Sequence, residues 1–423
     1  MRRMRGLALL VIFTAVGILY ATVSGISAEN VTLTLGSWRV DDVEQVQRLL
    51  SAFHAQHPNI EIRFAPTNPP DYNAVLRTQL TGGTGPDLMY VRSFKVGQDL
   101  FAEGYLEPLT GLDLETNYSE GSLEAWSLDG IPFAVPFMAV SHGIYYNVDL
   151  FNQHNLDVPQ TWEELLAVAE TLQAAGIIPF SNGSKDEWDM NEIVFMNLLP
   201  SFIGGREARL EYETGQVPFN DEKMISAFRA LQDIAPYLPM GQEGVSYYDA
   251  QQLFLLGRAA MFFGGSWDVA FFVNSAPSFE WSIFATPAPE GRPTVVTFHP
   301  DAGIGLNSAS PHKEVAYTFL KWLTTVEAAQ ILADEIPGFY PLNENPIIIE
   351  SKHANDFYAL SEGKEVDARF VWPVLQAGEP DGYLLTQTAA LAVVKGSMTP
   401  EEAADYLQTG LENWFEPTQK FAK

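Results

Sequence analysis

The first part of the chain alternates between strand-type and helix-type patterns. Apolar and polar residues alternate in 31–35 and 60–64, as they do in half-buried strands, and 87–91 predicts a third strand. The segment 43–53 repeats apolar residues at helical spacing, and 72–80 predicts a second helix. This order is typical of a parallel sheet with right-handed crossovers, whose ligands bind beyond the carboxyl ends of the strands.

Turn and capping signals organise the next stretch. Pro132 and Pro136 bracket a short apolar run, which we do not expect to form a regular central strand because proline donates no ladder hydrogen bond. Residues 144–146 predict a strand. Thr161 then opens a helix through a Thr-x-x-Glu capping box, and Gly176 ends that helix.

The later pattern continues to mix helices and strands. Helices are predicted at 192–200, 223–235 and 249–256, and buried strands at 260–263 and 281–284. Ser310-Pro311 predicts a further helix start, and a Thr-Pro-Glu-Glu capping box at 399–402 predicts the last helix. The sequence therefore predicts an α/β protein throughout.

Composition narrows the class of protein. Of 423 residues, 47% are hydrophobic and 18% charged, as in a globular protein with a large core. The absence of cysteine excludes disulfides, thiolate metal sites and a cysteine nucleophile. A formal charge of −29 repels phosphate backbones and anionic lipid, so we expect no nucleic-acid partner.

The chain begins like a secreted protein. Arg2, Arg3 and Arg5 precede an apolar run from Leu7 to Tyr20 and small residues up to Ala28, as in a signal peptide covering 1–28. An uncleaved membrane anchor is the alternative, because the apolar run is long for a signal. Without a cysteine at the cleavage site the protein cannot be a lipoprotein, so we expect a periplasmic or otherwise extracytoplasmic protein.

Motifs of catalysis and of metal binding are missing from the sequence. Residues 264–268 lack the last glycine of a Gly-x-Ser-x-Gly nucleophile elbow, and 82–85 lack the lysine of a phosphate loop. The seven histidines show no metal-ligand spacing. Adjacent acidic pairs lie at predicted helix starts, where the helix dipole explains them. We therefore expect no catalytic residue, no metal and no cofactor.

Aromatic residues in predicted loops are the main candidates for binding. The chain has 9 Trp, 16 Tyr and 27 Phe. Three loops place a tryptophan beside a charged residue: Trp38-Arg39, Trp188-Asp189 and Trp267-Asp268. A sugar presents a flat C–H face that stacks on an aromatic ring and hydroxyls that bind charged or amide groups, so this combination favours a saccharide.

Four segments resemble the family 1 extracellular solute-binding proteins of ABC importers, the maltose-binding-protein type. In chain order they are Gly85-Pro86-Asp87-Leu88 with Gly104-Tyr105-Leu106-Glu107-Pro108-Leu109; residues 128–180; Gly257-Arg258-Ala259-Ala260-Met261 with Gly265-Ser266-Trp267; and 311–316 with 319–323. The resemblance covers nearly all of the chain after its leader.

The resemblance implies an α/β, two-lobe periplasmic binding protein fold with a multi-segment hinge and an interlobe cleft. The N-terminal lobe would contain 29–136 and 302–340, and the C-terminal lobe 137–301 and 341–423. Crossings would lie near 134–139, 299–303 and 337–341. Such proteins close around their ligand by hinge bending.

The resemblance also implies a function and a set of ligand-binding residues. The chain would bind a sugar or short oligosaccharide without turnover, as a monomer, and deliver it to an ABC permease. A non-sugar ligand (polyamine, glycerol phosphodiester or peptide) and, less favoured, a secreted glycosidase stay open. The candidate ligand residues are Trp38, Arg39, Asp41, Ser93, Phe94, Lys95, Phe137, Trp188, Asp189, Ser266, Trp267, Asp268, Asp301, Tyr340, Trp372 and Tyr383.

Overall fold

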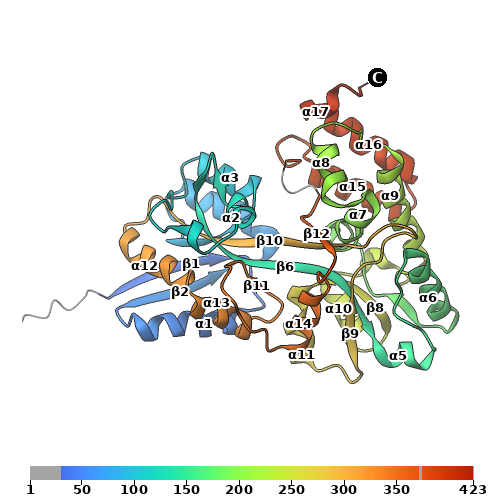
Figure 1. The fold of residues 1–423 in the computed structure, drawn as a ribbon, viewed down its shortest axis with the longest axis horizontal. Coiled ribbons are helices and arrows are strands. Elements are labelled where there is room, and N and C mark those ends of the chain that lie inside the picture. Colours follow the sequence, from blue (N-terminus) through green and yellow to red (C-terminus); the bar gives the residue numbers. More distant parts are fainter. Residues whose placement is uncertain (1–29, 371–373, 423) are drawn as a thin grey trace, which may run out of the picture.

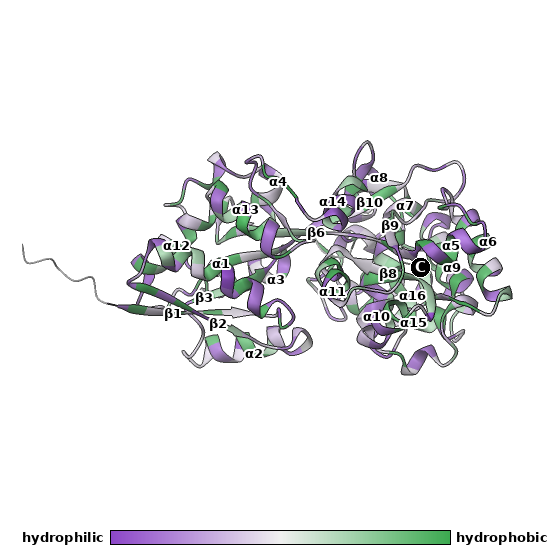
Figure 2. Ribbon diagram, turned by 90° about the horizontal axis from the view of Figure 1, so that it is seen from below, coloured by the Kyte–Doolittle hydropathy of each residue, from purple (hydrophilic) through white to green (hydrophobic). Residues whose placement is uncertain are grey.

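Two hydrophobic cores divide the residues that this computed structural model describes, 30–370 and 374–422. Each core is surrounded by its own helices, and Figure 1 shows the two resulting lobes joined by long strands. Figure 2, turned by 90°, shows the same division, with α1, α2 and α12 in one lobe and α5, α6 and α9 in the other.

The first lobe is built on a parallel sheet, as its alternating pattern predicts. Strands β1 and β2 and strands β1 and β3 pair in parallel, with helices between them. Apolar faces of the helices, such as Leu50 and Phe53 on α1, close the core. The elements are β1 (Val31–Ser37), α1 (Val43–Gln56), β2 (Ile60–Pro66), α2 (Pro69–Thr81), β3 (Leu88–Arg92), α3 (Lys95–Ala102), α4 (Glu120–Glu124), β4 (Ser127–Leu128), β5 (Ile131–Pro132), α12 (Lys313–Leu323) and α13 (Val326–Glu335).

The second lobe is richer in helices. Its core is fully buried around β8 and the helix pair α7 and α9. Its elements are α5 (Val148–Gln153), α6 (Trp162–Ala174), β7 (Ile178–Phe180), the π-helix η2 (Asp189–Phe195), α7 (Met196–Ile203), α8 (Gly205–Glu213), α9 (Glu222–Ile234), α10 (Tyr247–Leu255), β8 (Ala259–Gly265), α11 (Val269–Ser275), β9 (Trp281–Phe284), α14 (Lys352–Ala359), β12 (Glu365–Asp367), α15 (Gly382–Val394), α16 (Pro400–Glu412) and α17 (Glu416–Gln419).

Three strands cross between the lobes. The long strands β6 (Ala134–Asn147) and β10 (Val295–Leu306) run antiparallel to each other, and the short β11 (Tyr340–Pro341) pairs with β6. The main sheet follows the order β2-β1-β3-β10-β6-β8-β7, so it continues from one lobe into the other (Figure 1).

The core of the first lobe includes β6 as far as Val140, and that of the second begins on β6 at Ile144. On β10 the change of core lies between Val296 and Ala302. The predicted division of the chain, with limits at 136/137, 301/302 and 340/341, stays a prediction.

The expectation for Pro136 is wrong, because this proline lies inside the central strand β6. It pairs with Gly303, next to a break in the ladder: Ala302 faces Met138, so Phe137 has no partner on β10. A second irregularity leaves Asp301 of β10 without a partner on β6. A proline is tolerated beside such a bulge because the hydrogen-bond ladder is already interrupted there.

The helix predicted at 192–200 also differs from the structure. It begins as the π-helix η2 and continues through Pro200 to Ile203. Pro200 cannot donate to the carbonyl of Met196, but Thr297 Oγ1 donates to that carbonyl at 3.2 Å instead, so the helix is not interrupted. Helix α12 begins at Lys313 and not directly after Ser310, whose hydroxyl donates to Asp87.

Candidate ligand-binding site at the junction of the lobes

Trp267 is the most firmly held aromatic residue at the junction. It follows β8 in a single 3-10 turn, is half-buried, and packs against both hydrophobic cores. Its Nε1 donates to Tyr247 Oη at 2.9 Å, and the ring of His142 lies edge-on to it at 5.1 Å between centroids. The indole folds back over Gly265, where a Cβ would lie 2.2 Å from the ring. A glycine is therefore required there.

Asp268 holds this turn in place through buried hydrogen bonds. The carboxylate accepts from Tyr247 Oη at 2.6 Å, Gln251 Nε2 at 2.7 Å and the Gly265 N–H at 3.1 Å. Burial raises the pKa of Asp268 to about 7, although these three donors lower it. With 1% of its surface exposed, Asp268 offers no surface to a ligand in this structure. It orients the Tyr247–Trp267 pair.

Asp189 has a similar supporting role near Trp188. It is fully buried and accepts from Asn182 Nδ2 at 2.9 Å and from the Gly183 N–H at 3.2 Å. Burial raises its pKa to about 7. Trp188 itself is half-buried, and its ring centroid lies 4.5 Å from that of Tyr247. Trp188, Tyr247 and Trp267, which we call the aromatic group, are thus in contact through Tyr247.

In the first lobe, Trp38 is a core residue and not an open stacking surface. Only 4% of it is exposed, and its ring packs edge-on against Tyr72 and Tyr90. The guanidinium of Arg92 covers the ring at 4.3 Å from its centroid. The stacking role predicted for Trp38 is therefore not available in this structure, and Arg92 is the charged group presented there.

Arg39 and Asp41 lie at the edge of the first lobe. Arg39 forms an ion pair with Asp42 and lies over the ring of Phe339 at 4.8 Å. Burial lowers the pKa of Arg39, but the Asp42 carboxylate outweighs it, so the pKa is raised overall. Asp41 is exposed. Burial and then the Asp41 charge raise the pKa of Tyr248, which belongs to the second lobe.

The segment after β3 places one aromatic ring at the junction. Phe94 has φ 57° and ψ −136°, a conformation that a residue with a bulky side chain rarely adopts, and its ring packs against both cores. Ser93 is buried and donates to the Pro300 carbonyl at 2.9 Å. Lys95 is paired with Asp99 on its own helix. Of the three predicted residues, Phe94 is thus the one that contacts both lobes.

Three further predicted residues are buried in supporting positions. Ser266 is fully buried and accepts from the Ser141 N–H at 3.0 Å. Tyr340 is 3% exposed and donates to the Ala354 carbonyl at 2.8 Å. Phe137 is 8% exposed, at the bulge of β6. Because little of each side chain is exposed, we infer that these residues support the crossing strands and the Trp267 turn and do not form a ligand surface.

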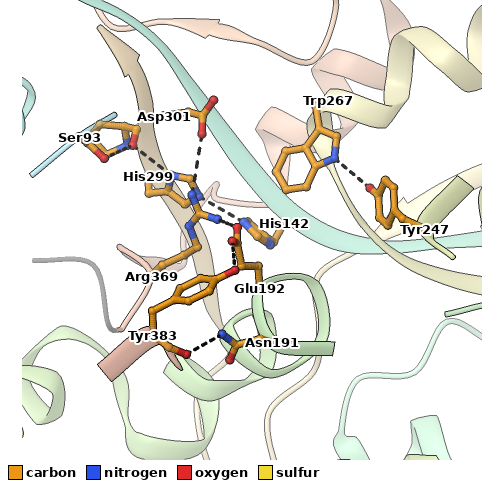
Figure 3. Close-up of polar contacts among 11 residues, drawn as sticks. Ser93, His142, Asn191, Glu192, Tyr247, Trp267, His299, Asp301, Arg369 and Tyr383 are labelled. Carbon is orange, nitrogen blue, oxygen red and sulfur yellow. Dashed lines mark hydrogen bonds and ion pairs between the residues drawn. The ribbon is translucent and has the colours of Figure 1, made fainter. Parts of the chain in front are cut away.

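Glu192 and Arg369 connect two predicted residues that are remote in sequence. Arg369 forms an ion pair with Glu192, and its Nη2 lies 3.8 Å from Asp301 Oδ1. Tyr383 Oη donates to Glu192 Oε1 at 2.5 Å. Figure 3 shows this cluster, with Asp301 and Tyr383 on opposite sides of Arg369. Trp372, predicted at the same site, lies outside the described residues.

Two buried histidines, His142 on β6 and His299 on β10, contact each other next to Trp267. His299 Nδ1 lies 3.2 Å from the Pro300 carbonyl and Nε2 lies 3.3 Å from Nε2 of His142. With Nδ1 of His299 donating to the carbonyl, its Nε2 accepts from His142. Burial and the charge of Arg369 lower the pKa of both rings well below the usual value, which keeps them neutral.

Sequence reasoning missed Glu192, Arg369, Arg92, Tyr247 and Tyr248. One usable signal was present: Arg369 is the only arginine after Arg292, and it precedes the predicted Trp372 by three residues. Glu192 gave no signal, because one acidic residue at the start of an apolar helix is ordinary. Tyr247 and Tyr248 could be read as helix residues.

Across 30–370 and 374–422, no three His, Asp or Glu side chains gather as metal ligands would. Within those ranges, no helix is both long and apolar enough for a membrane span.

Two α/β lobes joined by crossing strands, with aromatic and charged side chains at their junction, define the class of two-lobe binding proteins. The chain belongs to the bacterial extracellular solute-binding protein family, whose profile matches residues 37–330. The predicted resemblance and the predicted α/β two-lobe fold are thereby confirmed. The family places the protein outside the cytoplasm.

Three similar proteins illustrate the family. The multiple sugar-binding protein of Streptococcus mutans is 23% identical over 399 residues, 92% of this chain and 91% of its own. The maltotriose-binding protein of Pyrococcus abyssi is 25% identical over 342 residues, 79% of this chain and 71% of its own. The GacH receptor of Streptomyces glaucescens, solved unliganded and with acarbose, has a TM-score of 0.74 at 18% identity and covers 91% of this chain and 98% of its own.

Proposed function

We propose that this protein is the extracytoplasmic receptor of an ABC importer, and that it binds a sugar or short oligosaccharide between its lobes and delivers it to the membrane permease. The observation that carries the proposal is Trp267, a half-buried indole that packs against both cores and is held by Tyr247. A sugar ring stacked on it would touch both lobes, and so would favour their closed arrangement.

The side chains around this indole suit a saccharide. Trp188 gives the aromatic group a second half-buried indole, and Glu192 supplies a hydrogen-bond acceptor that Arg369 holds in place. The similar proteins named for their ligands are named for sugars, which supports the same ligand class here. The predicted site residues Arg39, Asp41, Phe94, Asp301 and Tyr383 would complete the surface, and the supporting aspartates would keep the tryptophans in place.

The proposal extends to how the protein works in the cell. Residues 1–28 would direct export and be removed, and the mature protein would act as a monomer without nucleic acid, metal or cofactor. It would release its ligand chemically unchanged, because the receptor binds without turnover. The strongly acidic surface would keep it soluble outside the cell.

A thermal-shift screen tests this function. The mature protein is unfolded and refolded to remove bound ligand, then mixed with maltotriose, raffinose, xylotriose, chitotriose, galactobiose, digalacturonate, spermidine, a glycerol phosphodiester and a short peptide. A ligand at 100 times its Kd should stabilise the protein by about 2.7 kcal/mol. We expect stabilisation by a saccharide that is recovered intact. Stabilisation only by spermidine, the phosphodiester or the peptide would remove the sugar assignment, and consumption of the sugar would indicate a glycosidase.

A further inference from the structure

The π-helix η2 presents a single side chain towards the junction. Of its seven residues, Asp189–Phe195, six are buried and only Glu192 is half-buried. A π-turn widens the helix by one residue and is frequent at functional sites, because it changes the direction in which a side chain points. The local structure of this segment therefore exposes one carboxylate at the start of an otherwise buried helix.

Two donors hold this carboxylate. Arg369 pairs with Oε2, and Tyr383 Oη donates to Oε1 at 2.5 Å. The side chain of Arg369 is 4% exposed, whereas that of Glu192 is 19% exposed, so the carboxylate is the accessible member of the pair. A carboxylate has about four acceptor positions, and the two donors occupy only half of them. Glu192 can therefore accept further hydrogen bonds from a ligand.

The cluster lies where the lobes meet. Arg369 also approaches Asp301, the bulged residue of the crossing strand β10, at 3.8 Å (Figure 3). Charges from both lobes act on Tyr383: burial and the Glu192 carboxylate raise the pKa of Tyr383, and the guanidinium groups of Arg369 and of Arg92 in the first lobe lower it. Glu192 is thus placed on the second-lobe side of the junction, in a cluster that reaches the crossing strand β10.

The local charges limit what Glu192 can recognise. Two carboxylates, Glu192 and Asp301, share the one guanidinium of Arg369. A ligand carboxylate or phosphate placed there would meet both carboxylates, and Arg369, with 4% of its side chain exposed, is itself little accessible to such a ligand. A neutral hydroxyl, in contrast, has a hydrogen to donate to a carboxylate that has no donor of its own.

We propose that Glu192 is a specificity-determining ligand residue, which accepts hydroxyl hydrogens from a neutral saccharide and disfavours acidic saccharides of the same size. This inference rests on the proposed function and adds to it the charge class of the sugar. It predicts that the protein prefers galactobiose to digalacturonate, two disaccharides that differ in their carboxylates.

Calorimetric titration of variants tests the inference. The wild type, Glu192→Gln and Glu222→Gln are titrated with the neutral saccharide that binds tightest in the screen, and with galactobiose and digalacturonate. Glu222 is the matched control, because its carboxylate pairs with Arg229 on an exposed face of the same lobe. We expect Glu192→Gln to weaken binding of the neutral saccharide at least about tenfold and to narrow the preference for galactobiose over digalacturonate. Glu222→Gln should bind all three saccharides as the wild type does.

A second variant, Glu192→Asp, keeps the test valid if Glu192→Gln does not fold. Glu192→Asp keeps the charge but shortens the side chain, so it should weaken neutral binding and still reject digalacturonate. Wild-type affinity in a folded Glu192→Gln protein, or in Glu192→Asp if the first variant does not fold, would overturn this inference and leave the proposed function standing. A wild type that binds digalacturonate as well as galactobiose would overturn it too. If the wild type binds no saccharide at all, both proposals fail.

Discussion

The tryptophan–aspartate pairs have divided roles at the level of single residues. In Trp188-Asp189 and Trp267-Asp268 the tryptophan is partly exposed, while the aspartate is buried and hydrogen-bonded within its own lobe. Adjacency in sequence predicted that both members would contact the ligand. On a helix or helical turn, however, consecutive side chains point in different directions, so only one of them can face the junction.

Replacement of Trp267 by alanine should weaken saccharide binding without unfolding the protein. The indole is half-buried and packs at the edge of both cores, so its loss removes stacking surface more than core packing. We expect at least about a tenfold higher Kd in calorimetric titration, with a near-native circular dichroism spectrum. An unchanged Kd would remove Trp267 from the site.

Asp268 should make stability depend on pH in a defined direction. Burial raises its folded-state pKa to about 7, above the unfolded value near 3.9. Between these values the folded state holds a proton that the unfolded state lacks, so the free energy of unfolding falls as pH rises, by at most about 1.4 kcal/mol per pH unit. Asp268→Asn should lose this contribution.

The measurement is the melting temperature at pH 5, 6, 7 and 8 for the wild type, Asp268→Asn and Asp405→Asn, an aspartate with an exposed side chain. The difference in melting temperature between the wild type and Asp268→Asn should change steadily between pH 5 and 7. The difference in melting temperature between the wild type and Asp405→Asn should stay constant over the same range. A pH-independent difference would contradict a raised pKa at Asp268.

At the level of elements, the crossing near 337–341 is coupled to the turn that carries Trp267. Gly338 has φ +96°, and a Cβ there would lie 1.8 Å from the Ser266 carbonyl oxygen, one residue before Trp267. The absence of a side chain at Gly338 therefore lets the crossing near 337–341 pack directly against the turn that carries Trp267.

Gly338→Ala should lower the melting temperature and saccharide affinity together. The clash with backbone and the left-handed φ should cost about 3 kcal/mol or more. Gly363→Ala is the control, because it has φ +68° but no atom within 4 Å of its Cβ, so only the backbone strain of about 1–2 kcal/mol remains. Equal effects of the two substitutions on affinity would contradict the coupling.

Much of the fold could be predicted from local pattern. The strands and helices of the first lobe follow the alternation at 31–35 and 60–64 and the helical spacing of 43–53, and the capping box at 399–402 is present as expected. Pro136 was misjudged because the sheet tolerates a proline there only beside the bulge at Phe137. Pro200 was misjudged because Thr297 donates to the Met196 carbonyl, which Pro200 leaves without a helical donor. Both compensations come from distant residues, which local pattern does not reveal.

The site was predictable only in part, for the same reason. Aromatic residues in loops could be found one at a time, and the resemblance to a known family predicted that they would line one cleft. Glu192, Arg369 and Tyr383 meet only through tertiary structure, and the covering of Trp38 by Arg92 depends on the pairing of β1 with β3. Sequence spacing contains no information on such contacts.

For the whole molecule, the three crossings predict closure by bending. The sheet continues from lobe to lobe through β6 and β10, so a few residues near the bulges at Phe137 and Asp301 can absorb the change. In small-angle X-ray scattering we expect a smaller radius of gyration on saturation with the saccharide, and for Trp267→Ala we expect the same decrease only at a saccharide concentration at least about tenfold higher. The same radius with and without bound saccharide would exclude closure.

We propose that this receptor binds a saccharide at the lobe junction and does not transform it. The most direct measurement is a calorimetric titration of the refolded mature protein with the saccharide from the screen, followed by chromatography of that saccharide after prolonged incubation. We expect one binding site per chain and quantitative recovery of the intact saccharide. Absence of binding heat for every saccharide, or loss of the saccharide with release of shorter products, would contradict it.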